Sequence, residues 1–165
     1  MKKLAKTVSA AAIALAVSMP AMAQDDDLVV SVKRLTLDTA ARVGMATIEA
    51  CREQGIQAGV TVVDRNGVVQ FQARDTVAPV ITLGISKGKA YAAANFMVNS
   101  SGLTERADGP IGRVPGVVMS AGAVLIEAGG SVYGAVGVSG APSGETDEAC
   151  AQAGLDAVKD DLEMM

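Results

Sequence analysis

The hydrophobic and polar positions in the first half of the chain predict a helix followed by a hairpin. Residues 35–55 have helical spacing, with Thr36 placed to cap the N-terminus and Gly55 just beyond the last turn. Residues 58–75 contain two β-branched runs on either side of Asn66-Gly67, a dipeptide typical of tight turns because both residues tolerate positive φ. These two runs are therefore predicted as antiparallel strands.

The second half predicts another helix, more strands and a final helix. Residues 82–100 have apolar and small residues at helical spacing, and residues 100–116 show no sustained period and are expected to form a long loop. Residues 117–140 read as a short apolar run and two strands joined at Gly129-Gly130. A last helix is expected from about Glu145 to Val158. This order predicts an α/β (α+β) fold with a central antiparallel sheet of about five strands, and not alternating βαβ units.

The N-terminal residues are typical of a cleaved secretory signal. Lysines at the start precede an apolar stretch too short to span a bilayer, and Ala21-Met22-Ala23 forms a small-residue cleavage site. We therefore expect a signal peptide over residues 1–23, an acidic leader over 24–34 and a single domain over 35–165. The expected protein is periplasmic or secreted and has no membrane insertion.

Composition excludes several classes of function. The chain has no His, no Trp and only two Tyr and two Phe residues, so Ser-His-Asp hydrolysis, His-based zinc sites and aromatic platforms that stack on nucleic-acid bases lack their parts. Removal of residues 1–23, which carry three lysines and no acidic residue, changes the net charge from −4 to about −7. A nucleic acid is therefore not an expected partner.

Cys51 and Cys150 are an even pair of cysteines in a chain expected to be exported. They would form a disulfide if their Cα atoms lie about 4.4 to 6.8 Å apart. Each also falls on a helical stripe with small or apolar neighbours, so both fit equally well as buried packing residues. The sequence leaves these two alternatives open.

The glycine-rich stretch 131–154 does not match a phosphate loop. Gly134, Gly137 and Gly140 fit neither of the common phosphate-binding spacings, no Lys follows them, and acidic residues crowd the start of the next helix. Gly134 and Gly137 are instead predicted to let a helix or another subunit approach the strand closely.

Three segments resemble one known family. VTVVDRNGVVQFQARD (60–75), SKGKAYAAANF (86–96) and GSVYGAVGVSGAPSGETDEACAQAGL (130–155) are similar, in this order, to the GlcG/HbpS family, also called the haem-degrading domain family. The resemblance extends from Leu35 to Val158. It implies a profilin-like fold, a homo-oligomer that is often an octamer, and in some members haem binding outside the cytoplasm.

One departure from the family bears on the iron ligand. Many relatives carry a His before the second helix, whereas this chain has Ala78-Pro79-Val80-Ile81-Thr82 there. A bound haem would then need another ligand, and a phenolate from Tyr91 suits ferric iron best. Packing at the edge of the core is the competing interpretation of Tyr91. The other candidates for iron, porphyrin or propionate contact are Thr82, Lys89, Phe96, Met97, Arg106, Arg113 and Met119.

Three functions compete at this point. The first is an exported haem or tetrapyrrole-binding protein for sequestration, degradation or sensing. The second is an oligomeric binding module or scaffold for a small carboxylate, favoured by the missing His and the few aromatic rings. The third is an enzyme acting on small acids with Lys89 as base or electrophile, although no set of residues reaches a catalytic assignment.

Overall fold

The computed structural model describes residues 28–165, so the expected signal peptide and the start of the leader lie outside the described residues. Residues 31–165 form one compact unit. Its elements in chain order are α1 (Leu37–Glu53), β1 (Gly59–Asp64), β2 (Val69–Arg74), α2 (Ile81–Phe96), the 3-10 helices η1 (Ser100–Arg106) and η2 (Pro110–Arg113), β3 (Ala123–Ala128), β4 (Ser131–Ser139) and α3 (Gly144–Glu163).

The four strands form one antiparallel sheet in the order β2-β1-β4-β3. This confirms the predicted fold class, but the expected count of about five strands was too high. The apolar run after residue 116 forms no strand, because the Val118 amide donates to the Gly88 carbonyl of α2 at 3.2 Å. The side chain of Met119 is buried against α2. The run therefore packs on a helix and does not extend the sheet.

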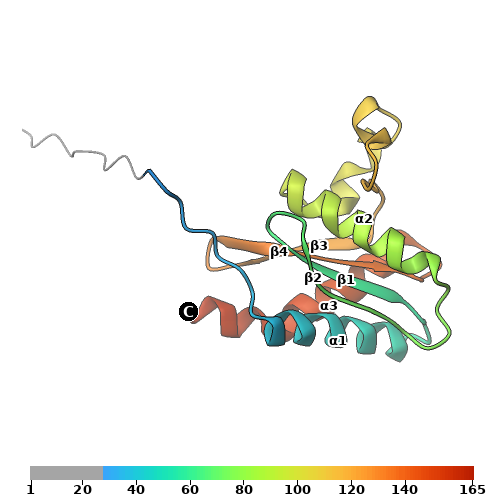
Figure 1. Ribbon diagram of the computed structural model, residues 1–165. Coiled ribbons are helices and arrows are strands. Elements are labelled where there is room, and N and C mark those ends of the chain that lie inside the picture. The colour runs from blue at the N-terminus through green and yellow to red at the C-terminus, as the bar shows by residue number, and fades with distance from the viewer. Residues whose placement is uncertain (1–27) are drawn as a thin grey trace, which may run out of the picture. The chain divides into compact units, whose positions relative to one another are not determined.

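Helices cover both faces of the sheet. Figure 1 shows α1 and α3 on one face and α2 on the other. The larger core lies between the sheet and the α1/α3 layer, where valines of β1 and β4 meet aliphatic residues of both helices. The core under α2 is smaller and consists mainly of alanines. Within the described residues, no helix has the length and apolar character needed to cross a membrane.

The turns and helix ends follow local chemistry. Thr36 caps α1 by accepting from the Thr39 amide, as predicted. In the β1–β2 turn only Gly67 has positive φ, +80°. Asn66 does not adopt positive φ. The turn is held by Asp64, whose Oδ1 accepts hydrogen bonds from the Asn66 and Val68 amides. The final helix begins as expected but continues to Glu163, five residues beyond the predicted end.

The glycine of β4 that faces α2 explains how closely the two elements pack. A Cβ atom added to Gly137 would lie 2.3 Å from the Ser86 carbonyl oxygen and 2.8 Å from the Ala90 nitrogen, both in α2. Only a residue without a side chain fits there, so the predicted close approach of a helix to this strand is confirmed.

Candidate functional site

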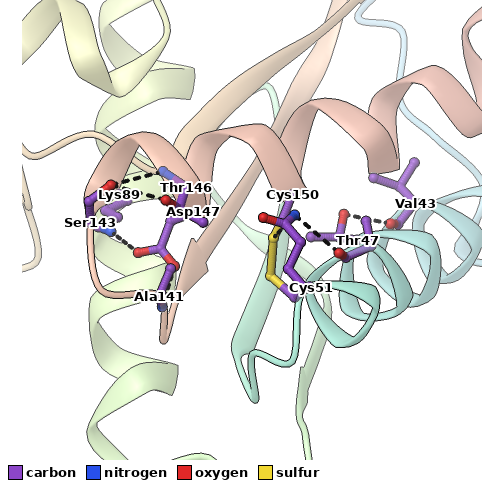
Figure 2. Close-up of a disulfide and its surroundings, with 11 residues drawn as sticks. Val43, Thr47, Cys51, Lys89, Ala141, Ser143, Thr146, Asp147 and Cys150 are labelled. Atoms are coloured by element: carbon purple, nitrogen blue, oxygen red, sulfur yellow. Dashed lines mark hydrogen bonds and ion pairs between the residues drawn. A yellow bond between two sulfur atoms is a disulfide. The ribbon is translucent and has the colours of Figure 1, made fainter.

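Helix α2 carries four of the eight residues predicted to contact a ligand, and one of these four, Lys89, lies in a buried ion pair. Its Nζ lies 2.8 Å from Asp147 Oδ2, and the two side chains are only 6% and 5% exposed. The other carboxylate oxygen of Asp147 accepts from the Ala141 amide at 2.9 Å. Figure 2 shows this pair joining α2 to the first turn of α3.

Sequence reasoning missed two residues that build this ion pair. In the sequence, Asp147 is only one of several acidic residues at the start of the last helix. Gly122 leaves the space for the pair, since a Cβ there would lie 2.5 Å from Lys89 Nζ and 2.9 Å from the Cβ of Asp147. Because Lys89 is enclosed and neutralised, it is not available to a propionate, and an ammonium held by a carboxylate is a poor base or nucleophile.

Two other candidates, Thr82 and Met119, are buried inside the fold. Thr82 is buried in the first turn of α2, where its hydroxyl donates to the Pro79 carbonyl at 2.7 Å. Met119 is buried in a small cluster with Ala92 and Leu103. Neither side chain reaches the surface, so neither can ligate iron without a rearrangement of the fold.

Tyr91 remains partly accessible. Its ring lies against the β1–β2 turn, and a Cβ on Gly67 would come within 2.6 Å of the Tyr91 Cδ2 atom. Within residues 28–165 no hydrogen bond ends on its hydroxyl. The structure thus leaves one phenol on α2 whose oxygen has no protein partner in the described part of the chain.

The remaining candidates lie at the C-terminal end of α2 or in the 3-10 helices that follow it in the chain. The Arg106 guanidinium lies 5.6 Å from the centre of the Phe96 ring, a cation–π contact. Met97 ends the helix in the left-handed conformation and is 43% exposed. Arg113 is exposed, and its guanidinium donates to the Asp108 carbonyl at 3.4 Å. The structure therefore brings Phe96 and Arg106 together, whereas Tyr91 contacts a different part of the chain.

A shallow groove of about 410 Å³ contains none of the predicted residues. Glu148, on its wall, accepts hydrogen bonds from Ser101 and from the Gly122 amide. Hydrogen bonds from its own backbone amide and from the Ser143 hydroxyl lower the pKa of Glu145 and favour its charged form. Such a groove repels propionates and other carboxylates. It is lined by Asn99, Ser101, Val124, Glu145, Glu148, Ala149 and Gln152.

Cys51 and Cys150 are bonded in the structure, with a Cα–Cα distance of 5.4 Å. Both are fully buried between α1 and α3 (Figure 2). No group of three or more His, Cys, Asp and Glu residues that could hold a metal ion occurs in the part of the chain that the structure describes.

Comparison with known proteins decides the family. A family model described as "Haem degrading protein HbpS-like" matches residues 35–156. The chain belongs to the HbpS-like haem-degrading protein family. No curated protein sequence matches it.

Solved structures support membership of the HbpS-like family. A double mutant of HbpS from Streptomyces reticuli is 31% identical, with a TM-score of 0.75, over 86% of this chain and 98% of that one. Protein ORFY from Klebsiella pneumoniae is 25% identical, with a TM-score of 0.73, over 79% and 94%. A haem complex of PduOC, 22% identical over 75% and 94% with a TM-score of 0.69, shares the fold.

Proposed function

We propose that this protein binds haem or a related tetrapyrrole and does so without a histidine ligand. The observation that carries the proposal is its membership of the HbpS-like haem-degrading family over residues 35–156, together with 31% identity to HbpS. The absence of His from the whole sequence sets the condition that the iron ligand is of another type.

The accessible residues carry the chemical groups that a tetrapyrrole held at the surface would use. Tyr91 offers an oxygen that can ligate ferric iron when it is deprotonated. Arg106 and Arg113 lie on the segment after α2 and can pair with propionates, while Phe96 and the exposed Met97 offer apolar contact. Haem, when bound, supplies the iron and its redox chemistry, and the chain supplies the ligand atom and the charges that orient the ring.

A haemin titration followed at the Soret band tests the proposal. Tyr91→Phe removes the phenol oxygen and keeps the ring against the β1–β2 turn. Tyr133→Phe is the matched control, because Tyr133 is the other tyrosine of the chain and is 5% exposed. We expect saturable binding that weakens at least tenfold in Tyr91→Phe and is unchanged in Tyr133→Phe.

Two other results separate the competing functions. Equal binding in both variants would reject Tyr91 as the ligand and leave haem binding standing, with Met97→Leu as the next variant. If no saturable binding occurs, haem as ligand is rejected, and the small-carboxylate module becomes the better interpretation. In that case Arg106 and Arg113 are the remaining candidates for binding the carboxylate, because Lys89 is already paired with Asp147.

We also propose that the protein is exported. The sequence of residues 1–23 and a buried disulfide, which is favoured in an oxidising compartment, support this location. The intact mass of the protein recovered from a periplasmic extract tests it. A chain that begins at Gln24 is expected, and a chain that retains residues 1–23 would contradict export by cleavage.

A further inference from the structure

The two edge strands of the sheet, β3 and β2, differ in whether their outward backbone groups have hydrogen-bond partners. On β3 the register directs the backbone groups of Ala123, Leu125 and Glu127 outward. The Ser100 hydroxyl accepts from the Ala123 amide at 2.8 Å, and the Asn99 side chain accepts from the Leu125 amide at 3.0 Å. These two side chains close most of the β3 edge to another strand.

The β2 edge has no such cover. The Asp75 amide donates to the Ala58 carbonyl, so the alternate residues Gln72 and Arg74 direct their backbone groups away from β1. In residues 28–165 no hydrogen bond ends on these two amides, and both residues are exposed. An uncovered edge of this kind is a template for an added strand.

The same chain has an unpaired segment with the composition of a strand. Residues 28–32 read Leu-Val-Val-Ser-Val and form no regular element. Leu28, Val29 and Val30 are 98%, 83% and 86% exposed, and Val32 is 51% exposed. β-branched residues favour an extended, half-buried position, so this exposure is costly unless a partner covers the segment.

Three contacts place residues 33–35, which follow this segment, over the sheet of their own protomer. Gln70 on β2 donates to the Leu35 carbonyl at 2.8 Å, and Arg34 lies 2.8 Å from Asp64 at the end of β1. Lys33 lies 5.9 Å from the centre of the Tyr133 ring on β4. Going backward from residue 35 to 33, the chain therefore passes from β2 over β1 to β4. The Lys33 side chain therefore lies over β4, two strands away from the β2 edge in the order β2-β1-β4-β3.

We propose that residues 28–32 of one protomer add as a strand to the outer edge of β2 in a second copy of the chain. Main-chain hydrogen bonds to Gln72 and Arg74 then pair the free backbone groups of the β2 edge and give the exposed segment 28–32 a partner strand. A reciprocal exchange uses the same two surfaces on both copies and closes into a two-fold dimer. The prediction of a homo-oligomer thereby gains a specific contact.

Cross-linking between two differently labelled copies tests this contact. One chain carries Val30→Cys and the other carries Gln72→Cys, and a short bismaleimide joins thiols that lie close together. Cys51 and Cys150 do not react, because they are bonded and fully buried. Glu127→Cys on the β3 edge is the matched control. We expect the 30–72 cross-link to dominate the peptide map and the 30–127 cross-link to be at least tenfold weaker.

Sedimentation of an arm variant gives a second, independent measurement. Leu28→Asp with Val30→Asp changes only exposed residues, so the fold is retained and circular dichroism checks this. We expect the variant to lose the dimer that the wild type forms at the same concentration. Equal cross-linking to both edges, or the same sedimentation for both proteins, would overturn the proposal. Neither result depends on whether haem binds.

Discussion

The two faces of the sheet differ in what fills them. The α1/α3 face holds valines, leucines and isoleucines together with the disulfide that ties the two helices. The α2 face holds mainly alanines, a glycine contact and the buried Lys89–Asp147 ion pair. Aliphatic burial and a cross-link stabilise the first face, whereas close backbone approach and one charge pair fix the second.

This difference separates stability from ligand binding. The residues proposed to contact a tetrapyrrole lie on α2 or just after it, on the thinner face. The opposite face contributes none of them. A change in the α1/α3 layer should therefore alter the free energy of unfolding with little effect on ligand affinity.

The largest effect is expected from the disulfide. It closes a loop with a sequence separation of 99, for which chain entropy predicts about 4 to 5 kcal/mol of stabilisation. Cys51→Ala with Cys150→Ala should lower the free energy of urea unfolding by about that amount and leave haemin affinity unchanged. The double variant also removes two buried sulfur atoms and so leaves a cavity. Reduced wild-type protein, which loses the bond but keeps both side chains, is the control for that loss of packing. Identical unfolding midpoints with and without reductant would show that the bond contributes nothing.

The buried ion pair should be next in size. Lys89→Met leaves Asp147 charged and without its partner in the core, which costs about 3 kcal/mol or more. Adding Asp147→Leu should recover much of that loss, since the buried charge is then gone. The matched control is Arg42→Ala in the exposed pair Arg42–Asp161, where both side chains are 58% exposed and less than about 1 kcal/mol is expected. If Lys89→Met costs no more than Arg42→Ala, the pair does not fix the α2 face.

A smaller effect is expected where α2 crosses β4. Gly137→Ala places a methyl carbon 2.3 and 2.8 Å from two backbone atoms of α2, closer than van der Waals contact allows, and should cost about 1 to 3 kcal/mol. Gly84→Ala in the same helix meets no atom within 4 Å and should instead stabilise by about 0.5 to 1 kcal/mol. Thermal unfolding measures both. A neutral Gly137→Ala would mean that the helix can move away from the strand at little cost.

The sequence predicted the fold better than the site, for physical reasons. Turn and cap residues such as Thr36, Gly67 and Gly129 interact with residues only a few positions away, so the sequence around them is enough to predict them. The partner of Lys89 is 58 residues away, and nothing in local spacing pairs it with Asp147. The apolar run after residue 116 has the composition of a strand, but its packing against α2 depends on the tertiary fold.

The smallest expected effect is a pH dependence on the α1/α3 face. Arg52 donates two hydrogen bonds to Asp75, at 2.7 and 2.8 Å, and these lower the pKa of Asp75 to about 2. An unfolded Asp titrates near about 3.9, so the contact stabilises the fold above that pH and is lost as the pH falls towards 2. Because Arg52 is 42% exposed, water and salt screen the pair and keep the effect small.

Asp75→Asn should flatten the stability profile between pH 4 and 2 while leaving its shape above pH 5 unchanged, because the native carboxylate is fully ionised there. Glu49→Gln is the control, since Glu49 binds the same guanidinium at 3.2 Å but is 62% exposed. Urea unfolding at several pH values measures the difference. A profile that is as steep in Asp75→Asn as in the wild type would assign the acid sensitivity to other carboxylates and remove this contact from the forces that hold α1 to the end of β2.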